Sequence, residues 1–218
     1  MFLVLTDEHR PGPLANTSRM TSTTRHIGIF LFPDVEELDA VGPYEVLAYW
    51  TRSYPSDGWT TSTISRDGEP VIGAKGLSLG AHHASHDAPG LDVFLHPGGM
   101  GTRPLTQDTA HLDYVRGLRT SVPLLTSVCT GSLVYAAAGL LAGRPATTHW
   151  GAVDELTALD ESIVVDGSAR FVDDGDMITS AGISAGIDMA LHLVSRLAGV
   201  ERAREVRRGI QYDPLPPV

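Results

Sequence analysis

The chain contains little cysteine, little positive charge and no long apolar run, and each shortage excludes a class of protein. One cysteine in 218 residues cannot form an internal disulfide, so a disulfide-held secreted scaffold is excluded and the cytoplasm is the expected compartment. The 16 Lys and Arg residues are outnumbered by 26 acidic residues, giving a formal charge of −10. This balance argues against a nucleic-acid partner, which needs a basic face. No apolar run approaches the ~20 residues that span a membrane.

The distribution of apolar residues predicts an α/β protein. Residues 26–32, 91–96 and 122–128 form nearly continuous apolar runs, which are typical of strands buried on both faces of a parallel sheet. Further strands are expected at 60–65, 77–81, 145–149, 163–165, 170–173 and 177–179, and helices at 34–50 (with an interruption at its Gly-Pro pair), 108–119, 130–141, 151–159, 183–198 and 201–212. Strands that alternate with helices predict a three-layer α/β/α sandwich with a mostly parallel central sheet.

Residues 1–24 are polar and irregular, so we expect a flexible N-terminal leader, followed by a single α/β domain over residues 25–218. In such domains, functional sites form beyond the carboxyl ends of the strands. This rule directs attention to the residues that follow Phe32, His96 and Val128.

Cys129 is the strongest candidate for chemistry. It follows an apolar strand and precedes a predicted helix that opens with Thr130, Gly131 and Ser132. This order of strand, tight turn and helix is that of a nucleophile elbow, with Ser127 where the first glycine usually stands. A helix N-terminus stabilises a thiolate, so we expect a lowered thiol pKa. The alternative is an inert buried cysteine, since free cysteine is among the most buried residue types.

Two glycines follow the second apolar strand. Gly98 and Gly99 come directly after residues 91–96, where a tight turn would expose their backbone N–H groups. Together with the N–H of Thr130, these amides could form an oxyanion-type cradle beside the sulfur. An ordinary turn is the alternative interpretation.

Asp39 lies in an acidic segment after the first apolar strand. Its neighbours Leu38 and Val41 are apolar, so we expect the carboxyl to sit among buried side chains. Burial beside a thiolate would raise its pKa and suit it to proton transfer near neutral pH. Alternatively, Asp39 is an ordinary acidic residue at a helix N-terminus, where the helix dipole stabilises its negative charge.

The histidines suggest two further sites, neither of which the sequence favours. His82, His83 and His86 are close enough to suggest metal ligands, but no second cluster and no spare cysteine accompany them. We therefore expect no metal and no organic cofactor. His149 could pair with Cys129, as in thiol hydrolases. A histidine packed against the tryptophan that follows it is the favoured interpretation.

Four segments together resemble the ThiJ/PfpI family: FPDVEELDAVGP, LHPGGMG, TSVCTGSLVYAAAGLLAGRPATTHW and TSAGISAGIDMAL. The resemblance extends from about residue 26 to the end of the chain, where IQYDPLPP is similar as well. It implies the class I glutamine amidotransferase-like fold, which is flavodoxin-like. Within the family, the chain resembles the isocyanide (isonitrile) hydratases. Members of the family usually form dimers, so the resemblance also implies a homodimer.

The resemblance implies a role for each matching residue. Cys129 matches the nucleophile, Asp39 the carboxylate that donates and accepts protons, and Gly99 a glycine on the oxyanion side. Thr130 matches a residue whose backbone and hydroxyl support the site. The implied activity is that of a cofactor-free hydro-lyase, which adds water to an isonitrile to give an N-substituted formamide. Family peptidases carry histidine directly after the cysteine, where this chain has Thr130, so a peptidase is not expected.

Two other functions would use the same residues. One is a glyoxalase-like or deglycase-like enzyme acting on small aldehydes, although these enzymes normally carry glutamate at the position of Asp39. The other is a non-catalytic thiol or ligand sensor related to the sensing domain of AraC-type regulators. We expect no helix-turn-helix region after residue 212, and the negative charge does not suit DNA binding.

Overall fold

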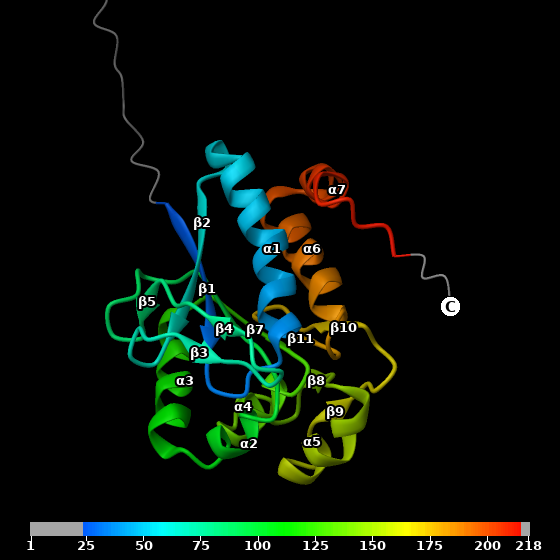
Figure 1. Ribbon diagram of the computed structural model, residues 1–218. Helices are drawn as coiled ribbons and strands as arrows, with labels where there is room; N and C mark the ends of the chain where they lie inside the picture. Colours follow the sequence, from blue (N-terminus) through cyan, green and yellow to red (C-terminus); the bar gives the residue numbers. More distant parts are fainter. Residues whose placement is uncertain (1–23, 215–218) are drawn as a thin grey trace, which may run out of the picture.

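A seven-stranded sheet forms the centre of the computed structural model, which describes residues 24–214 (Figure 1). The strand order is β10-β11-β7-β6-β1-β2-β5, and every neighbouring pair is parallel except β10 and β11. The strands are β1 (Arg25–Leu31), β2 (Trp59–Ser65), β5 (His83–Ala84), β6 (Val93–His96), β7 (Leu124–Val128), β10 (Phe171–Asp173) and β11 (Met177–Ser180). The predicted mostly parallel sheet is confirmed.

Helices cover both faces of this sheet, which confirms the three-layer sandwich (Figure 1). Helices α1, α6 and α7 lie on one face, and α3 and α4 lie on the other. The helices are α1 (Glu37–Ser53), α2 (Thr102–Leu105), α3 (Thr109–Ser121), α4 (Gly131–Ala137), α5 (Val153–Leu159), α6 (Ala185–Ala198) and α7 (Val200–Gly209), with single 3₁₀ turns at Pro55–Asp57 and Trp150–Ala152.

Helix α1 continues through the Gly42-Pro43 pair, where the sequence predicted an interruption. A proline inside a helix removes one backbone hydrogen bond, but packing against α6 holds the helix together. A Cβ on Gly42 would lie 3.0 Å from the side chain of Ile187 on α6, so glycine here allows the two helices to approach closely. Tertiary contact therefore overrides the local helix-breaking signal.

Other differences from the prediction are local. Helix α4 ends before residue 141 because the chain reverses at Gly139, whose φ is 77°. Residues 77–81 do not join the central sheet: β4 (Ser78–Leu79) pairs with β3 (Val71–Ile72) in a small outlying hairpin, and β8 (Pro145–Ala146) pairs with β9 (Val164–Val165) in another. Strand β5, strand β3 and helix α2 are too short to show a periodic pattern and were not predicted.

The leader expected at 1–24 lies outside the described residues except for Thr24, as does the end of the IQYDPLPP segment. Within residues 24–214, no helix has the length and apolar character needed to cross a membrane.

Candidate active site

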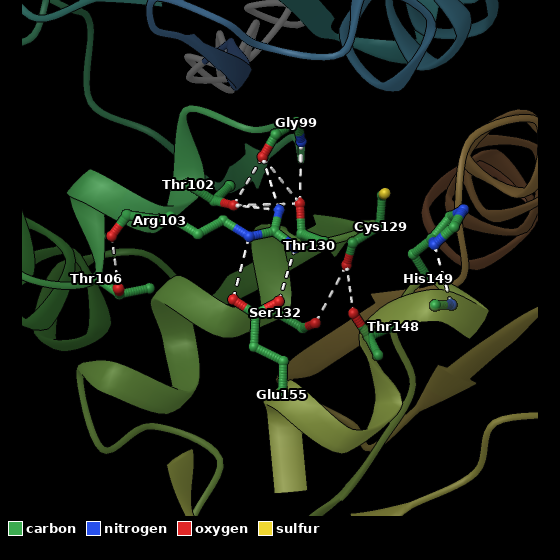
Figure 2. Close-up of polar contacts among 11 residues, drawn as sticks. Gly99, Thr102, Arg103, Thr106, Cys129, Thr130, Ser132, Thr148, His149 and Glu155 are labelled. Carbon is green, nitrogen blue, oxygen red and sulfur yellow. Dashed lines mark hydrogen bonds and ion pairs between the residues drawn. The ribbon is translucent and has the colours of Figure 1, made fainter. Parts of the chain in front are cut away.

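Cys129 occupies a strained turn between β7 and α4, as the elbow motif predicts. Its φ is 57°, in the left-handed region that side-chain-bearing residues rarely adopt. Its N–H donates to the carbonyls of Ser180 (3.0 Å) and Ala181 (3.3 Å). Its carbonyl accepts hydrogen bonds from the hydroxyls of Ser132 (3.1 Å) and Thr148 (3.0 Å), as Figure 2 shows. Backbone contacts on both sides therefore hold the strained residue in place.

Two glycines make room for this turn. A Cβ on Gly131 would lie 2.2 Å from the carbonyl oxygen of His96, so only glycine fits where α4 begins. A Cβ on Gly182 would lie 3.2 Å from Sγ of Cys129 and 2.2 Å from Cδ2 of His149. Gly182 thus brings the loop after β11 against both the sulfur and the imidazole. Gly182 lies in the TSAGISAGIDMAL segment, but its role could not be predicted from the sequence, because the residues it contacts are 30 or more positions away.

Asp39 is fully buried in the first turn of α1. Its Oδ2 accepts a hydrogen bond from the N–H of Gly98 at 3.1 Å. Among the described residues, no well-aligned donor reaches Oδ1, which is also buried. Burial raises the pKa of Asp39 to about 7, while the Cys129 thiol and the Gly98 N–H act in the opposite direction. The expectation of a buried carboxyl with a raised pKa is confirmed.

The neighbours of Asp39 do not behave as the sequence predicted. Leu38 and Val41 are each 39% exposed, although both were expected to be buried. The helical period explains the difference, because positions 38 and 41 share a face of α1 that turns away from the face carrying Asp39. The carboxyl is buried by the loop that carries Gly98 and by the elbow, not by its own flanking residues.

The pKa of the Cys129 thiol is raised, which contradicts the expectation of a lowered value. Burial is the largest cause, and the negative charge of Asp39 adds to it; the N–H and hydroxyl of Thr130 favour the thiolate but are outweighed. The helix N-terminus favours the thiolate, but desolvation and the nearby carboxylate oppose ionisation more strongly. Because the two groups interact strongly, they titrate as a pair. The thiol can become a nucleophile by passing its proton to Asp39.

The amides of Gly98 and Gly99 are used within the protein and do not form the cradle expected beside the sulfur. The Gly98 N–H donates to Asp39, and the Gly99 N–H donates to Oγ1 of Thr130 at 3.0 Å. Gly99 has a φ of 121°, and a Cβ there would lie 2.3 Å from the backbone nitrogen of Glu36. The two glycines therefore let the loop lie against the start of α1 and orient the carboxyl and the hydroxyl.

A clamp from α2 and α5 holds this loop, and the sequence did not reveal it. The carbonyl of Gly99 accepts hydrogen bonds from Oγ1 of Thr102 (2.8 Å), Nη1 of Arg103 (3.2 Å) and Oγ1 of Thr130 (3.2 Å) (Figure 2). Two further bonds of the Arg103 guanidinium, at 2.7 and 3.1 Å, bind the carboxylate of Glu155. The contributing residues come from three separate segments, so no sequence motif joins them.

His149 and His82 each hydrogen-bond to a neighbouring group of the protein. Nδ1 of His149 accepts the N–H of Gly151 at 3.1 Å, so this nitrogen is engaged within its own turn. The ring packs against Trp150 with centroids 5.3 Å apart, as the sequence favoured. Nδ1 of His82 contacts Oγ1 of Thr63 at 2.7 Å, and within residues 24–214 no group of three potential ligands could hold a metal ion.

Comparison with known proteins identifies the family. Residues 25–196 match the DJ-1/PfpI family. The chain is 44% identical over 191 residues to an isonitrile hydratase from Pseudomonas putida, covering 88% of this chain and 80% of that protein. It is 32% identical over 192 residues to the HTH-type transcriptional regulator GbdR of Pseudomonas aeruginosa, covering 87% of this chain and 51% of the regulator, so this chain spans about half the regulator's length.

A solved structure is similar as well. The crystal structure of a ThiJ/PfpI family protein from Pseudomonas syringae superimposes with a TM-score of 0.79 at 28% identity, covering 96% of this chain and 84% of that one. The sheet, the strained cysteine turn and these similarities agree with one another. The chain belongs to the DJ-1/PfpI family.

Proposed function

We propose that the protein is an isocyanide hydratase, which adds water to an isonitrile and releases an N-substituted formamide. The observation that carries this proposal is the buried pair formed by Cys129 and Asp39, in which the raised pKa of each group favours sharing one proton. A reaction that adds a sulfur and a proton to the same carbon needs this combination. The 44% identity to an isonitrile hydratase over most of the chain supports the same conclusion.

In the first step, the sulfur of Cys129 attacks the terminal carbon of R–N≡C. Asp39 takes the thiol proton and delivers it to that carbon, so a C–S bond and a C–H bond form and the product is the thioimidate R–N=CH–S–Cys. Thr130, whose N–H favours negative charge on the sulfur, supports the attack. Covalent catalysis divides one difficult addition into two easier steps.

In the second step, Asp39 is again ionised and accepts a proton from water as the water oxygen attacks the thioimidate carbon. The carboxyl then passes a proton to the nitrogen, giving R–NH–CH(OH)–S–Cys. Collapse of this adduct breaks the C–S bond, releases R–NH–CHO and returns the hydroxyl proton to the Cys129–Asp39 pair. The atoms of R–NC and H₂O are fully accounted for, and in this scheme the Cys129–Asp39 pair carries every proton transfer.

Cyclohexyl isocyanide tests this function directly. The purified protein is expected to convert it to N-cyclohexylformamide, with the product identified by mass spectrometry against a no-enzyme control. Methylglyoxal tested in parallel distinguishes an enzyme of small aldehydes, which carries the same kind of thiol. Turnover of methylglyoxal with no formamide from isocyanide would overturn the proposal in favour of that alternative.

We also propose that two copies of the chain associate through the surface beside the active site. Val41 and Leu38 on α1, with Ile72 and Leu77 on the β3–β4 hairpin, expose between 39% and 55% of their surface. The hairpin lies beside the start of α1, since the N–H of Ala74 donates to the carbonyl of Val35, and exposed apolar surface typically marks an interface. The expected particle has twice the mass of one chain by light scattering. Val41→Glu should shift it toward the monomer, whereas Val200→Glu, at an exposed valine on α7, should not; a monomeric wild type would contradict this proposal.

The catalytic thiol also favours a reducing compartment such as the cytoplasm.

A further inference from the structure

His96 is a fully buried polar residue that the proposed reaction does not use. It ends β6, directly before the loop that carries Gly98. Its ring lies among aromatic side chains, 5.5 Å from Phe30 and 6.0 Å from Tyr135 between centroids. An imidazole in such surroundings is costly to bury unless both of its nitrogens have hydrogen-bond partners. Both of them do.

The two hydrogen bonds determine which nitrogen carries the proton. Nδ1 lies 2.8 Å from the carbonyl oxygen of Pro97, which can only accept, so Nδ1 carries the hydrogen. Burial lowers the pKa of His96 to about 3 and that of His111 to about 4, so both rings are neutral. Nε2 of His96 is therefore an acceptor, and Nε2 of His111, 3.0 Å away, donates to it. His111 on α3 thus fixes the orientation and the tautomer of His96.

The Pro97 carbonyl and the Gly98 N–H belong to one peptide unit. This unit is planar and trans, so the group that holds its oxygen also sets the direction of its N–H. That N–H donates to Oδ2 of Asp39 at 3.1 Å. Among the described residues, no backbone N–H of a turn or loop donates to the Pro97 oxygen, so the His96 ring supplies the hydrogen bond that orients this peptide. The His96 imidazole therefore acts on the Asp39 carboxyl through one rigid peptide unit, that of Pro97 and Gly98.

Space around this peptide is tight. A Cβ on Gly131 would lie 2.8 Å from the Pro97 oxygen, and a Cβ on Gly98 would lie 2.5 Å from the Thr130 nitrogen. A rotation of the peptide plane would therefore disturb the start of α4, next to Cys129, as well as Asp39. The His96 ring therefore holds a peptide on which the positions of both Cys129 and Asp39 depend.

We propose that His96 is a positioning residue for the Cys129–Asp39 pair: held by His111, it fixes the Pro97–Gly98 peptide so that the Gly98 N–H points at Asp39. This inference deepens the proposed function, on which its consequence for catalysis rests. The positioning itself concerns the carboxyl and the thiol and does not depend on which substrate they use.

The influence of His96 on the Cys129–Asp39 pair can be distinguished from that of the other charged groups nearby. Glu36 raises the pKa of Asp39 and Lys75 lowers it, while Cys129 faces the carboxyl from the elbow. On the other side, the groups that face the two imidazoles are Tyr114, Tyr135, Asp108 and Arg66. The His96 variants replace none of these charged groups, so a shift in the titration of the pair is assigned to the loss of the Gly98 hydrogen bond.

The test compares His96→Asn with His96→Leu. The amide nitrogen of asparagine occupies the place of Nδ1 and can still donate to Pro97, whereas leucine fills the space without a donor. For His96→Leu, kcat for hydration should fall about tenfold with little change in KM, since the loss concerns orientation of the reacting groups. His96→Asn should retain at least about half of the wild-type kcat.

Alkylation of Cys129 by iodoacetamide provides a readout that does not require hydratase activity. The rate should rise in the wild type near pH 7, where Asp39 becomes ionised and can take the thiol proton. In His96→Leu the midpoint should move upward by up to about one pH unit, because the carboxylate has lost a hydrogen bond. In His96→Asn it should stay near the wild-type value. This shift distinguishes failure of the inference from failure of the proposed function.

Equal kcat and equal alkylation midpoints in His96→Leu and the wild type would overturn the inference, as would equal impairment of the leucine and asparagine variants. If His96→Leu does not fold, the pair His111→Gln and His111→Leu gives the same comparison. Glutamine keeps a donor at the place of Nε2, and leucine does not. The midpoint should then shift in His111→Leu only, and no shift in either variant would contradict the positioning role.

Discussion

Replacing Cys129 by alanine is expected to lower kcat/KM for isocyanide hydration by more than about 1,000-fold. In the proposed mechanism the sulfur forms the bond to the isocyanide carbon, and Cys129 is the one cysteine of the sequence. The fold should survive, because alanine keeps the backbone contacts to Ser180 and Thr148 that hold the turn. Alanine carries the same Cβ as cysteine and therefore the same strain at a φ of 57°. Formamide production measured with both proteins checks the prediction.

Ser127→Ala is the matched control for this variant. Ser127 is buried two residues before Cys129, and no hydrogen-bond partner of its hydroxyl is found in residues 24–214. Removing an unpaired buried hydroxyl should leave activity and thermal stability near the wild-type values. Full activity in Cys129→Ala would show that the thiol does not react with substrate, and the proposed mechanism would then be wrong.

Replacing Asp39 by asparagine is expected to lower kcat by about 100-fold to 1,000-fold. Asparagine preserves the volume of the side chain and can accept the Gly98 N–H, but it can neither take the thiol proton nor deliver it to carbon. In the wild type, kcat/KM should rise with pH through about 7, as the pair loses its first proton. The asparagine variant should lack this rise. Activity measured from pH 5 to 9 in both proteins tests these expectations together.

Stability gives an independent check on the burial of Asp39. Its pKa is raised from about 3.8 in the unfolded chain to about 7 in the folded protein, so the folded state binds the extra proton between these values. Wild-type stability should therefore fall as pH rises from 4 to 7, whereas asparagine does not titrate. The stability of Asp39→Asn relative to the wild type should increase by as much as ~4 kcal/mol over this range. Denaturant unfolding at pH 4.5 and 8 measures it; a difference that is independent of pH would mean that the carboxyl is not desolvated.

The architecture of the sheet could be predicted from the sequence. Continuous apolar runs mark strands that are covered on both faces, and the longest of these became β1, β6 and β7. The strand–turn–helix order placed Cys129 correctly because an elbow is made by residues adjacent in the chain. Asp39 and the Gly98–Gly99 loop follow neighbouring strands, so the rule that sites gather at the carboxyl ends of strands brought them to the same edge.

Electrostatics and orientation were decided only by the tertiary structure. The sequence predicted a lowered thiol pKa from one local feature, whereas burial and the Asp39 charge raise it. Likewise, the Gly98 N–H points at Asp39 and the Gly99 N–H points at Thr130, and these partners come from other segments of the chain. The clamp on the Gly99 carbonyl joins α2 to α5, and the His96–His111 contact joins β6 to α3. The sequence by itself determined the sheet, the elbow position of Cys129 and the carboxyl that lies near it, because these follow from periodicity and from adjacent residues. The pKa values of Asp39 and Cys129, and the hydrogen bonds that orient their side chains, depend on groups that are distant in the sequence. Burial and hydrogen-bond geometry arise only once the chain has packed.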